Sequence, residues 1–186
     1  MGEPRFRGID ELAQRCGHYA WTERRLFELA GTVAAGPGRP VARVVLSVVS
    51  RRRAALAAQW EERLPVRDGV DRGALVAAPP GRLATALDAL AGAPSADDFV
   101  AGLVTVLLPR LLAAYEDDRV SASPVAEGPV IATLDLSACV TRDDMEDGRA
   151  LLAGAPPPGS HVTELTEFCQ DLNRQFQGGH GVFPGA

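Results

Sequence analysis

Two charged side chains fall on helical stripes that otherwise consist of apolar and small residues. Arg53 belongs to a stripe with alternating spacings of four and three residues, together with Ala42, Leu46, Val49, Leu56, Trp60 and Leu64. Glu23 belongs to a second such stripe, together with Leu12, Cys16, Tyr19, Leu26, Ala30 and Val33. A buried carboxylate without a partner is costly, so the pattern predicts an interior Glu23–Arg53 ion pair. If the helical phase is off by one residue, both side chains face solvent instead.

An interior pair of this kind is able to perform acid–base chemistry. Glu23 would accept a proton and Arg53 would stabilise an anionic leaving group, which makes these two the candidate catalytic residues. The side chains that we expect to line a small-molecule pocket around them are Tyr19, Trp60, Tyr115 and Thr141. Aromatic residues on such stripes are alternatively ordinary core residues.

The remaining charged clusters have plainer interpretations. Arg51, Arg52 and Arg53 spread over roughly 200° of a helix at 100° per residue, which favours a solvated face with one buried arginine. The run RDDMED at 142–147 is typical of an exposed acidic face with Arg142 and Arg149 as partners within the helix, although Asp144 or Asp135 would alternatively add polar groups to the interior.

His161 and Glu164 have the i,i+3 spacing of a shared metal site or an acid–base pair. Their position near the start of a helix favours ordinary surface residues. No nucleotide-binding glycine motif or nucleophile elbow is present in the sequence.

Proline and glycine divide the chain into helical segments. We predict long helices at 9–35, 41–64, 96–120 and 125–153, a short helix at 82–91 and a C-terminal helix at 161–177. Ser95 and Asp98 form a capping box for the third long helix, and Pro109 should kink it. These segments predict an all-α fold: a single domain over residues 1–186, built as a bundle of four long helices with one or two accessory helices.

Composition limits the classes of partner. A net charge of −5 gives no bulk field that would favour nucleic acid. The sequence has no apolar run of membrane-spanning length and no secretory signal, so we expect no membrane span. Three dispersed cysteines are typical of a reducing compartment, and we expect a cytoplasmic protein.

Several segments together resemble a known family. HYAWTERRLFELAG, SRRRAALAAQWEERLP, VLLPRLLAAYEDD and GRALLAG, with the closing GGHGVFPGA, resemble a group of small bacterial ferritin-like proteins that are related to the ferritin-like tRNA hydroxylases. The resemblance implies a ferritin-like four-helix bundle and an ancestral di-iron oxygenation. It also implies that Glu23 matches the carboxylate ligand on the first helix of the metal-binding relatives.

The sequence departs from the ligand pattern of that family. Its histidines are His18, His161 and His180, and none has a glutamate three residues before it, so the chain lacks any Glu-x-x-His pair. We therefore expect that the di-iron ligands are lost and that no metal or cofactor is bound.

The sequence leaves three functions open. We expect a metal-independent enzyme whose core pocket performs elimination, isomerisation or cyclisation on a small molecule in specialised-metabolite biosynthesis. The first alternative is a non-catalytic partner subunit of a heteromeric enzyme complex. Apolar helix faces, such as that of 99–115, would then form a homo- or hetero-oligomer. The second alternative is a di-iron oxygenase.

Overall fold

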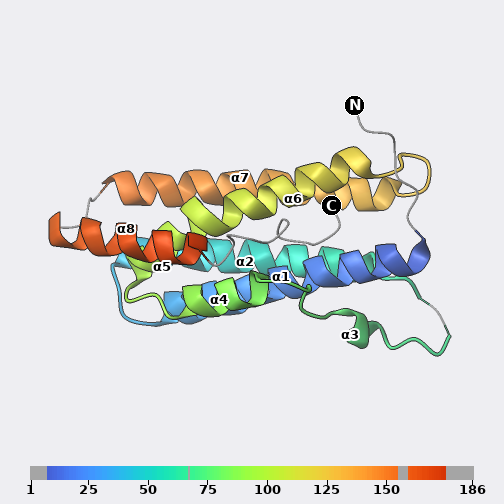
Figure 1. Ribbon diagram of the computed structural model, residues 1–186, viewed down its shortest axis with the longest axis horizontal. Helices are drawn as coiled ribbons and strands as arrows, with labels where there is room; N and C mark the ends of the chain where they lie inside the picture. Colours follow the sequence, from blue (N-terminus) through green and yellow to red (C-terminus); the bar gives the residue numbers. More distant parts are fainter. Residues whose placement is uncertain (1–7, 67, 155–158, 175–186) are drawn as a thin grey trace.

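The computed structural model describes residues 8–66, 68–154 and 159–174, which fold into helices joined by turns and loops (Figure 1). No residue in these ranges belongs to a β-strand. The predicted all-α class is therefore confirmed for the described part of the chain.

The helices lie close to their predicted positions. The elements in chain order are α1 (Ile9–Ala35), α2 (Pro40–Glu62), α3 (Arg72–Leu75), α4 (Leu83–Ala91), α5 (Ala96–Gly102), the π-helical turn η1 (Leu103–Leu107), α6 (Leu108–Ser121), α7 (Gly128–Gly154) and α8 (Gly159–Arg174). The predicted helix at 96–120 corresponds to the continuous stretch α5–η1–α6. The last residues of the predicted C-terminal helix, 175–177, lie outside the described residues.

Local sequence signals explain two of the helix starts. Pro40 occupies the first turn of α2, where its missing N–H has no helical partner to lose. The Ser95 hydroxyl caps α5 by accepting a hydrogen bond from the backbone N–H of Asp98 at 3.2 Å, and it donates one to the Asp98 carboxylate at 2.6 Å. The predicted capping of this helix by Ser95 is thus confirmed.

The π-helical turn η1 ends immediately before the turn that contains Pro109. Proline lacks a backbone N–H, so the carbonyl four residues earlier cannot receive its usual hydrogen bond. The helix responds with a wider turn over Leu103–Leu107 and then continues as α6. Pro109 therefore changes the hydrogen-bonding pattern of the helix without ending it.

Side-chain contacts give the directions of the long helices. Arg24 pairs with Glu61 whereas Arg43 reaches the carbonyl of Ala34, so α1 and α2 are antiparallel. Trp60 contacts Ser137 whereas Arg52 contacts Asp144, so α2 and α7 are antiparallel as well.

Helices α6 and α7 are also antiparallel, because Arg119 pairs with Asp135 and Glu116 pairs with Arg142. It follows that α2 and α5–η1–α6 run in the same direction. The connection between α2 and α5 must therefore return along the length of the molecule, and Figure 1 shows α3 and α4 on this return path.

The return path is packed against the core. Helix α4 buries Leu83, Ala86, Leu87 and Leu90. Helix α3 has no buried residues, yet its last backbone carbonyl lies directly over Gly17 of α1. A Cβ at Gly17 would lie 1.9 Å from the oxygen of Leu75, so glycine is required there.

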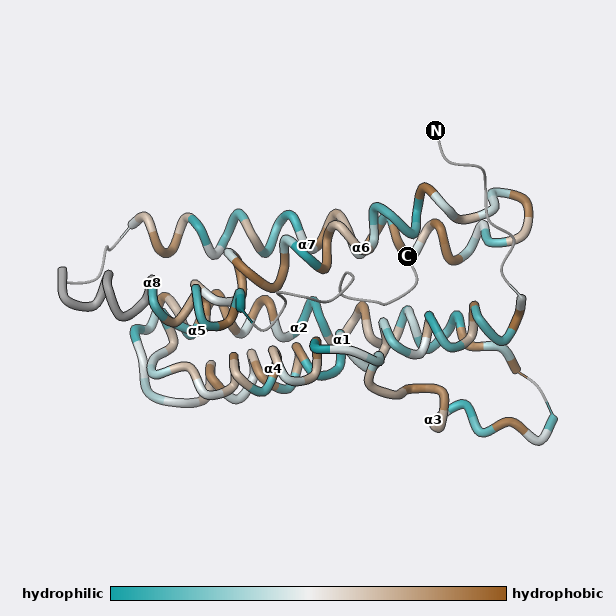
Figure 2. Tube along the Cα trace, viewed as in Figure 1, coloured by the Kyte–Doolittle hydropathy of each residue, from teal (hydrophilic) through white to brown (hydrophobic). Residues whose placement is uncertain are grey.

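The long apolar stretch Ala96–Ser121 is covered by other helices. Figure 2 shows apolar colouring through α5 and into the start of α6, which pack against α4, α7 and α8. By length and composition alone Ala96–Ser121 would be able to cross a membrane, but 72% of its most apolar window is buried inside the protein. Its apolar circumference is thus explained largely by contacts within the chain, and the suggestion that residues 99–115 bury against another chain is not needed to explain it.

We predict that Gly17→Ala destabilises the protein by roughly 1–3 kcal/mol, the usual cost of overpacking, although alanine favours helix more than glycine does. The added methyl group meets a backbone carbonyl that moves only if α3 moves. Urea unfolding monitored by circular dichroism measures the effect. Gly128→Ala is the matched control because nothing lies within 4 Å of its added Cβ. Equal stability of the two variants would contradict the packing of α3 on α1.

Candidate functional site

Arg53 lies between two carboxylates in the centre of the protein. Its Nη1 donates to both Glu23 oxygens, at 3.2 and 3.3 Å. Its Nε and Nη2 both donate to Oδ2 of Asp144, at 3.0 and 2.6 Å. The interior ion pair expected from the two stripes is therefore formed, and α7 adds a second carboxylate to it.

Two hydroxyl groups complete this arrangement. Arg53 Nη1 also donates to Thr141 Oγ1 at 3.1 Å, and the Tyr115 hydroxyl donates a hydrogen bond to Oε1 of Glu23. We call Glu23, Arg53, Tyr115, Thr141 and Asp144 the Arg53 cluster. Its members come from α1, α2, α6 and α7, and each has 0% exposed surface. The cluster thus connects helices α1, α2, α6 and α7.

In the Arg53 cluster, burial and the opposite charges nearby shift the pKa values of Glu23 and Arg53 in opposite directions. Burial raises the pKa of Glu23, while Arg53 and the Tyr115 hydrogen bond oppose the rise. Burial alone would lower the pKa of Arg53, but Glu23 and Asp144 raise it, so its guanidinium stays charged. Burial also raises the pKa of Tyr115 well above its usual value, and the Glu23 charge adds to the effect. Tyr115 is therefore a hydrogen-bond donor rather than a phenolate.

The other two arginines of the basic run have different roles. Arg51 is exposed, as expected for a solvated face. Arg52 is half-buried, and its Nη1 bridges Asp144 and Asp147 at 2.8 Å each. The prediction that 142–147 forms an exposed acidic face with partners inside its helix is wrong for Asp144, which is buried and bound by α2. The alternative, in which Asp144 adds a polar group to the interior, is confirmed. Arg142 pairs with Glu116 of α6 rather than within α7.

Tyr115 of the Arg53 cluster packs with two further aromatic rings, those of Tyr19 and Trp60. Tyr19 stacks on Trp60 with ring centroids 4.6 Å apart, and Tyr115 lies 4.9 Å from Tyr19. The Trp60 indole N–H donates to Ser137 Oγ at 3.1 Å. The structure brings together all the residues predicted for the pocket, but the rings contact one another and are at most 1% exposed. This packing favours the alternative interpretation of the rings as core residues.

A second, partly buried ion pair, Arg15–Asp118, is bonded to the hydroxyl of one of the aromatic rings. The Tyr19 hydroxyl donates to Oδ2 of Asp118 at 2.6 Å, and Arg15 donates to Oδ1 at 2.5 Å. We did not predict Asp118 as a buried residue from the sequence. It lies three residues after Tyr115 in the helix, and this spacing was the signal that would have placed it on the inner face.

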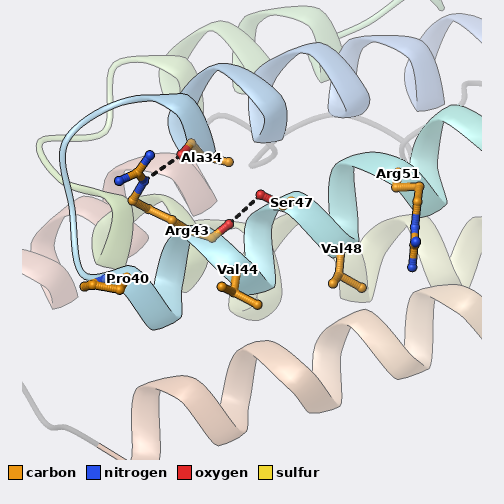
Figure 3. Close-up of a pocket in the computed structure, with 7 residues that line it drawn as sticks. All are labelled: Ala34, Pro40, Arg43, Val44, Ser47, Val48 and Arg51. Atoms are coloured by element: carbon orange, nitrogen blue, oxygen red, sulfur yellow. Dashed lines mark hydrogen bonds between the residues drawn. The ribbon is translucent and has the colours of Figure 1, made fainter.

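Two surface grooves lie among the described residues, and neither is lined by a residue of the Arg53 cluster. One, of about 610 Å³, is lined by Ala34, Pro40, Arg43, Val44, Ser47, Val48 and Arg51 (Figure 3). The other, of about 420 Å³, is lined by Ala101, Thr105, Val106, Leu152, Cys169, Gln170 and Asn173. Neither groove contains a residue that we predicted as catalytic or substrate-binding.

The residues present do not fit a di-iron centre. Glu23 and Asp144 are the carboxylates that face each other, and the guanidinium of Arg53 lies between them, bonded to both. Within the described residues no group of three or more histidine, cysteine, aspartate or glutamate side chains gathers in a way that would hold a metal ion. The side chains of His161 and Glu164, our other candidate pair, lie outside the described residues.

No family model, curated protein or solved structure matches this chain. Function must therefore be argued from the chemistry of the residues themselves.

We predict that Arg53→Met destabilises the protein by about 3–5 kcal/mol, because it leaves two carboxylates buried without their cation. Adding Glu23→Gln and Asp144→Asn to Arg53→Met should recover part of that loss, since the uncompensated charges are then gone. Chemical unfolding of the three proteins measures this. The control is Arg51→Met, an exposed neighbour on the same helix, which should change stability by no more than about 0.5 kcal/mol. A cost for Arg53→Met as small as the control would show that the cluster is not a structural ion pair.

The raised pKa of Glu23 predicts how stability changes with pH. Because its pKa is higher in the folded than in the unfolded protein, the folded state binds the proton more readily, and this contribution is lost as pH rises from about 4.5 through the raised value. The free energy of unfolding of the wild type, minus that of Glu23→Gln, should therefore fall with rising pH. Glu28→Gln, an exposed glutamate change on the same helix, is the control. A difference that grows with pH would contradict the direction of this shift.

Proposed function

We propose that this chain is a metal-free member of the ferritin-like superfamily that acts as a non-catalytic partner protein. Its four-helix core would be held by Arg53 where metal-binding relatives hold iron. The single observation that carries the proposal is the bonding of the buried Arg53 guanidinium to carboxylates of both α1 and α7.

The helix directions support the ferritin-like part of the proposal. Ferritin-like bundles have one long crossover connection, whereas simple up-and-down bundles have only short loops. Here α2 and α5–η1–α6 run in the same direction, and residues 63–95 make the long return between them. The four segments that resemble the ferritin-like proteins lie on α1, α2, the η1–α6 stretch and α7.

The saturation of the Arg53 cluster supports a structural role. Glu23, the candidate proton acceptor, already binds Arg53 and Tyr115, and Arg53 uses its Nε and both Nη atoms on protein partners. A substrate anion would have to displace Glu23 or Asp144 from a fully buried position. Because each member is inaccessible, we place the function on the surface of the protein.

The enzymatic hypothesis, with Glu23 and Arg53 as catalytic residues, stays a prediction. The variant Glu23→Gln distinguishes this hypothesis from our proposal, because it keeps the shape of the side chain and removes its ability to accept a proton. Under our proposal, a strain that carries this variant retains the biological activity of the wild type. Loss of activity in a variant that is folded and soluble would favour the enzyme.

Metal titration tests the role of Arg53. We predict that the wild type binds no stoichiometric Fe²⁺ or Co²⁺, because the guanidinium already neutralises the two carboxylates. In contrast, Arg53→His should bind Co²⁺, since imidazole and two carboxylates form a ligand set for such ions. Cobalt absorbance and isothermal titration calorimetry give the stoichiometry. Arg51→His is the control, as this residue is exposed and away from Glu23 and Asp144. Stoichiometric iron in the wild type would overturn the proposal.

A further inference from the structure

We propose that the groove between α5–η1, α7 and α8 binds an uncharged small organic molecule that carries an amide group on an apolar body. Seven residues line this groove, which we call the α8 groove: Ala101, Thr105, Val106, Leu152, Cys169, Gln170 and Asn173. The proposal goes beyond the proposed function, because a non-catalytic partner protein and an enzyme would both be able to hold such a ligand.

The α8 groove lies where several helical elements meet. Ala101 belongs to α5, Thr105 and Val106 belong to η1, Leu152 lies in the last turn of α7, and the remaining lining residues belong to α8. Helix α8 packs on both α5 and η1, and Figure 1 shows it beside α5. The groove has a volume of about 420 Å³, within the range of about 300–1,000 Å³ that is typical of small-molecule sites.

The π-helical turn η1 supplies a hydrogen-bond acceptor to the groove. Thr105, at the centre of η1, is exposed, whereas its neighbours Val104 and Val106 are buried. Its hydroxyl donates to the carbonyl of Ala101 at 2.6 Å, so its one proton is used. The lone pairs of Thr105 Oγ1 therefore remain for a donor on a ligand. Turns of this π-helical kind recur at functional sites.

Asn173 supplies a hydrogen-bond donor whose direction is fixed. Arg110 donates from Nη2 to Oδ1 of Asn173 at 2.6 Å, and from Nη1 to the carbonyl of Val106 at 3.3 Å. A guanidinium group only donates, so the oxygen of the Asn173 amide must face Arg110 and its Nδ2 must face the other way. Asn173 is half-buried, and Nδ2 donates to no residue that the structure describes. A ligand carbonyl would be its acceptor.

Gln170 adds a second amide on the same side of α8. It lies three residues before Asn173, which places the two side chains next to each other on the helix surface. Gln170 is exposed, and among the described residues its side chain has no hydrogen-bond partner. The groove therefore offers donors and acceptors together, and an amide, with one C=O and one N–H, matches both.

The described lining of the α8 groove contains no charged side chain. Burial raises the pKa of the Cys169 thiol, so this group is also neutral near pH 7. An ion that entered the groove would lose hydration without an opposite charge in the lining to replace it, which favours an uncharged ligand. The apolar side chains of Ala101, Val106 and Leu152 would contact its hydrocarbon part.

Titration of the full chain with benzamide, followed by ¹H–¹⁵N nuclear magnetic resonance, tests the proposal. We expect saturable shifts of the backbone amide signals of Thr105, Gln170 and Asn173. Benzoate and benzamidine have the same ring and nearly the same size but carry a charge, and each should bind at least about threefold more weakly, since it loses hydration without a compensating ion pair. Binding of benzoate as tight as that of benzamide would overturn the proposal, as would an absence of saturable shifts at the groove.

Two variants make the result specific to the α8 groove. Asn173→Asp keeps an oxygen for Arg110, so that α8 stays attached, and removes the Nδ2 donor; it should raise the dissociation constant of benzamide about two- to tenfold, the effect of one hydrogen bond. The matched control is Gln14→Glu, the same amide-to-carboxylate change at an exposed position of α1, which should leave binding unchanged.

Thr105→Trp places a large ring in the groove at an exposed position and should abolish the benzamide shifts at Gln170 and Asn173, while circular dichroism checks that the variant is folded. Benzamide binding that both Asn173→Asp and Thr105→Trp leave unchanged would show that the α8 groove is not the site. The metal titration of Arg53 does not depend on these outcomes, so failure of either proposal is recognisable separately.

Discussion

The structure depends on protein oxygen atoms that replace water as hydrogen-bond acceptors for the buried guanidinium of Arg53. Removing a charged group from water costs several kcal/mol unless close partners replace the lost hydration. Arg53 meets this requirement with a carboxylate from α1, a carboxylate and a hydroxyl from α7, and a tyrosine on α6 that binds the first carboxylate. Helices α1, α2, α6 and α7 must therefore come together for any member of the cluster to be tolerated in the interior.

This requirement also selects the phase of each helix. Apolar stripes alone allow neighbouring helices to rotate or slide with modest loss, since one aliphatic contact replaces another. A shift of one residue in α2 would turn Arg53 by about 100° and leave Glu23 and Asp144 buried without a cation. The aromatic group of Tyr19, Trp60 and Tyr115 adds a second constraint, because the Trp60 N–H also needs its acceptor, Ser137. We infer that polar contacts in this core contribute specificity more than net stability.

The members of the Arg53 cluster are bonded to one another and fully buried, whereas other elements lie on the outside of the bundle. The long return between α2 and α5 lies along the molecule and covers part of α1, where Gly17 admits the backbone of α3.

The sequence by itself determined the helical class, the helix boundaries to within a few residues and the two stripes that carry Glu23 and Arg53. These are local properties. The helical period of the apolar residues, the prolines at helix ends and the Ser95 cap each depend only on residues a few positions away in the sequence. What only the tertiary structure decided was the choice between buried and solvated alternatives. For Asp144 the sequence favoured an exposed acidic face over the interior, yet it binds Arg53 inside the core, and Asp118 was not recognised at all. The physical reason is that a carboxylate is tolerated inside only when a cation from a distant segment reaches it, and helical periodicity carries no information about which distant segments meet.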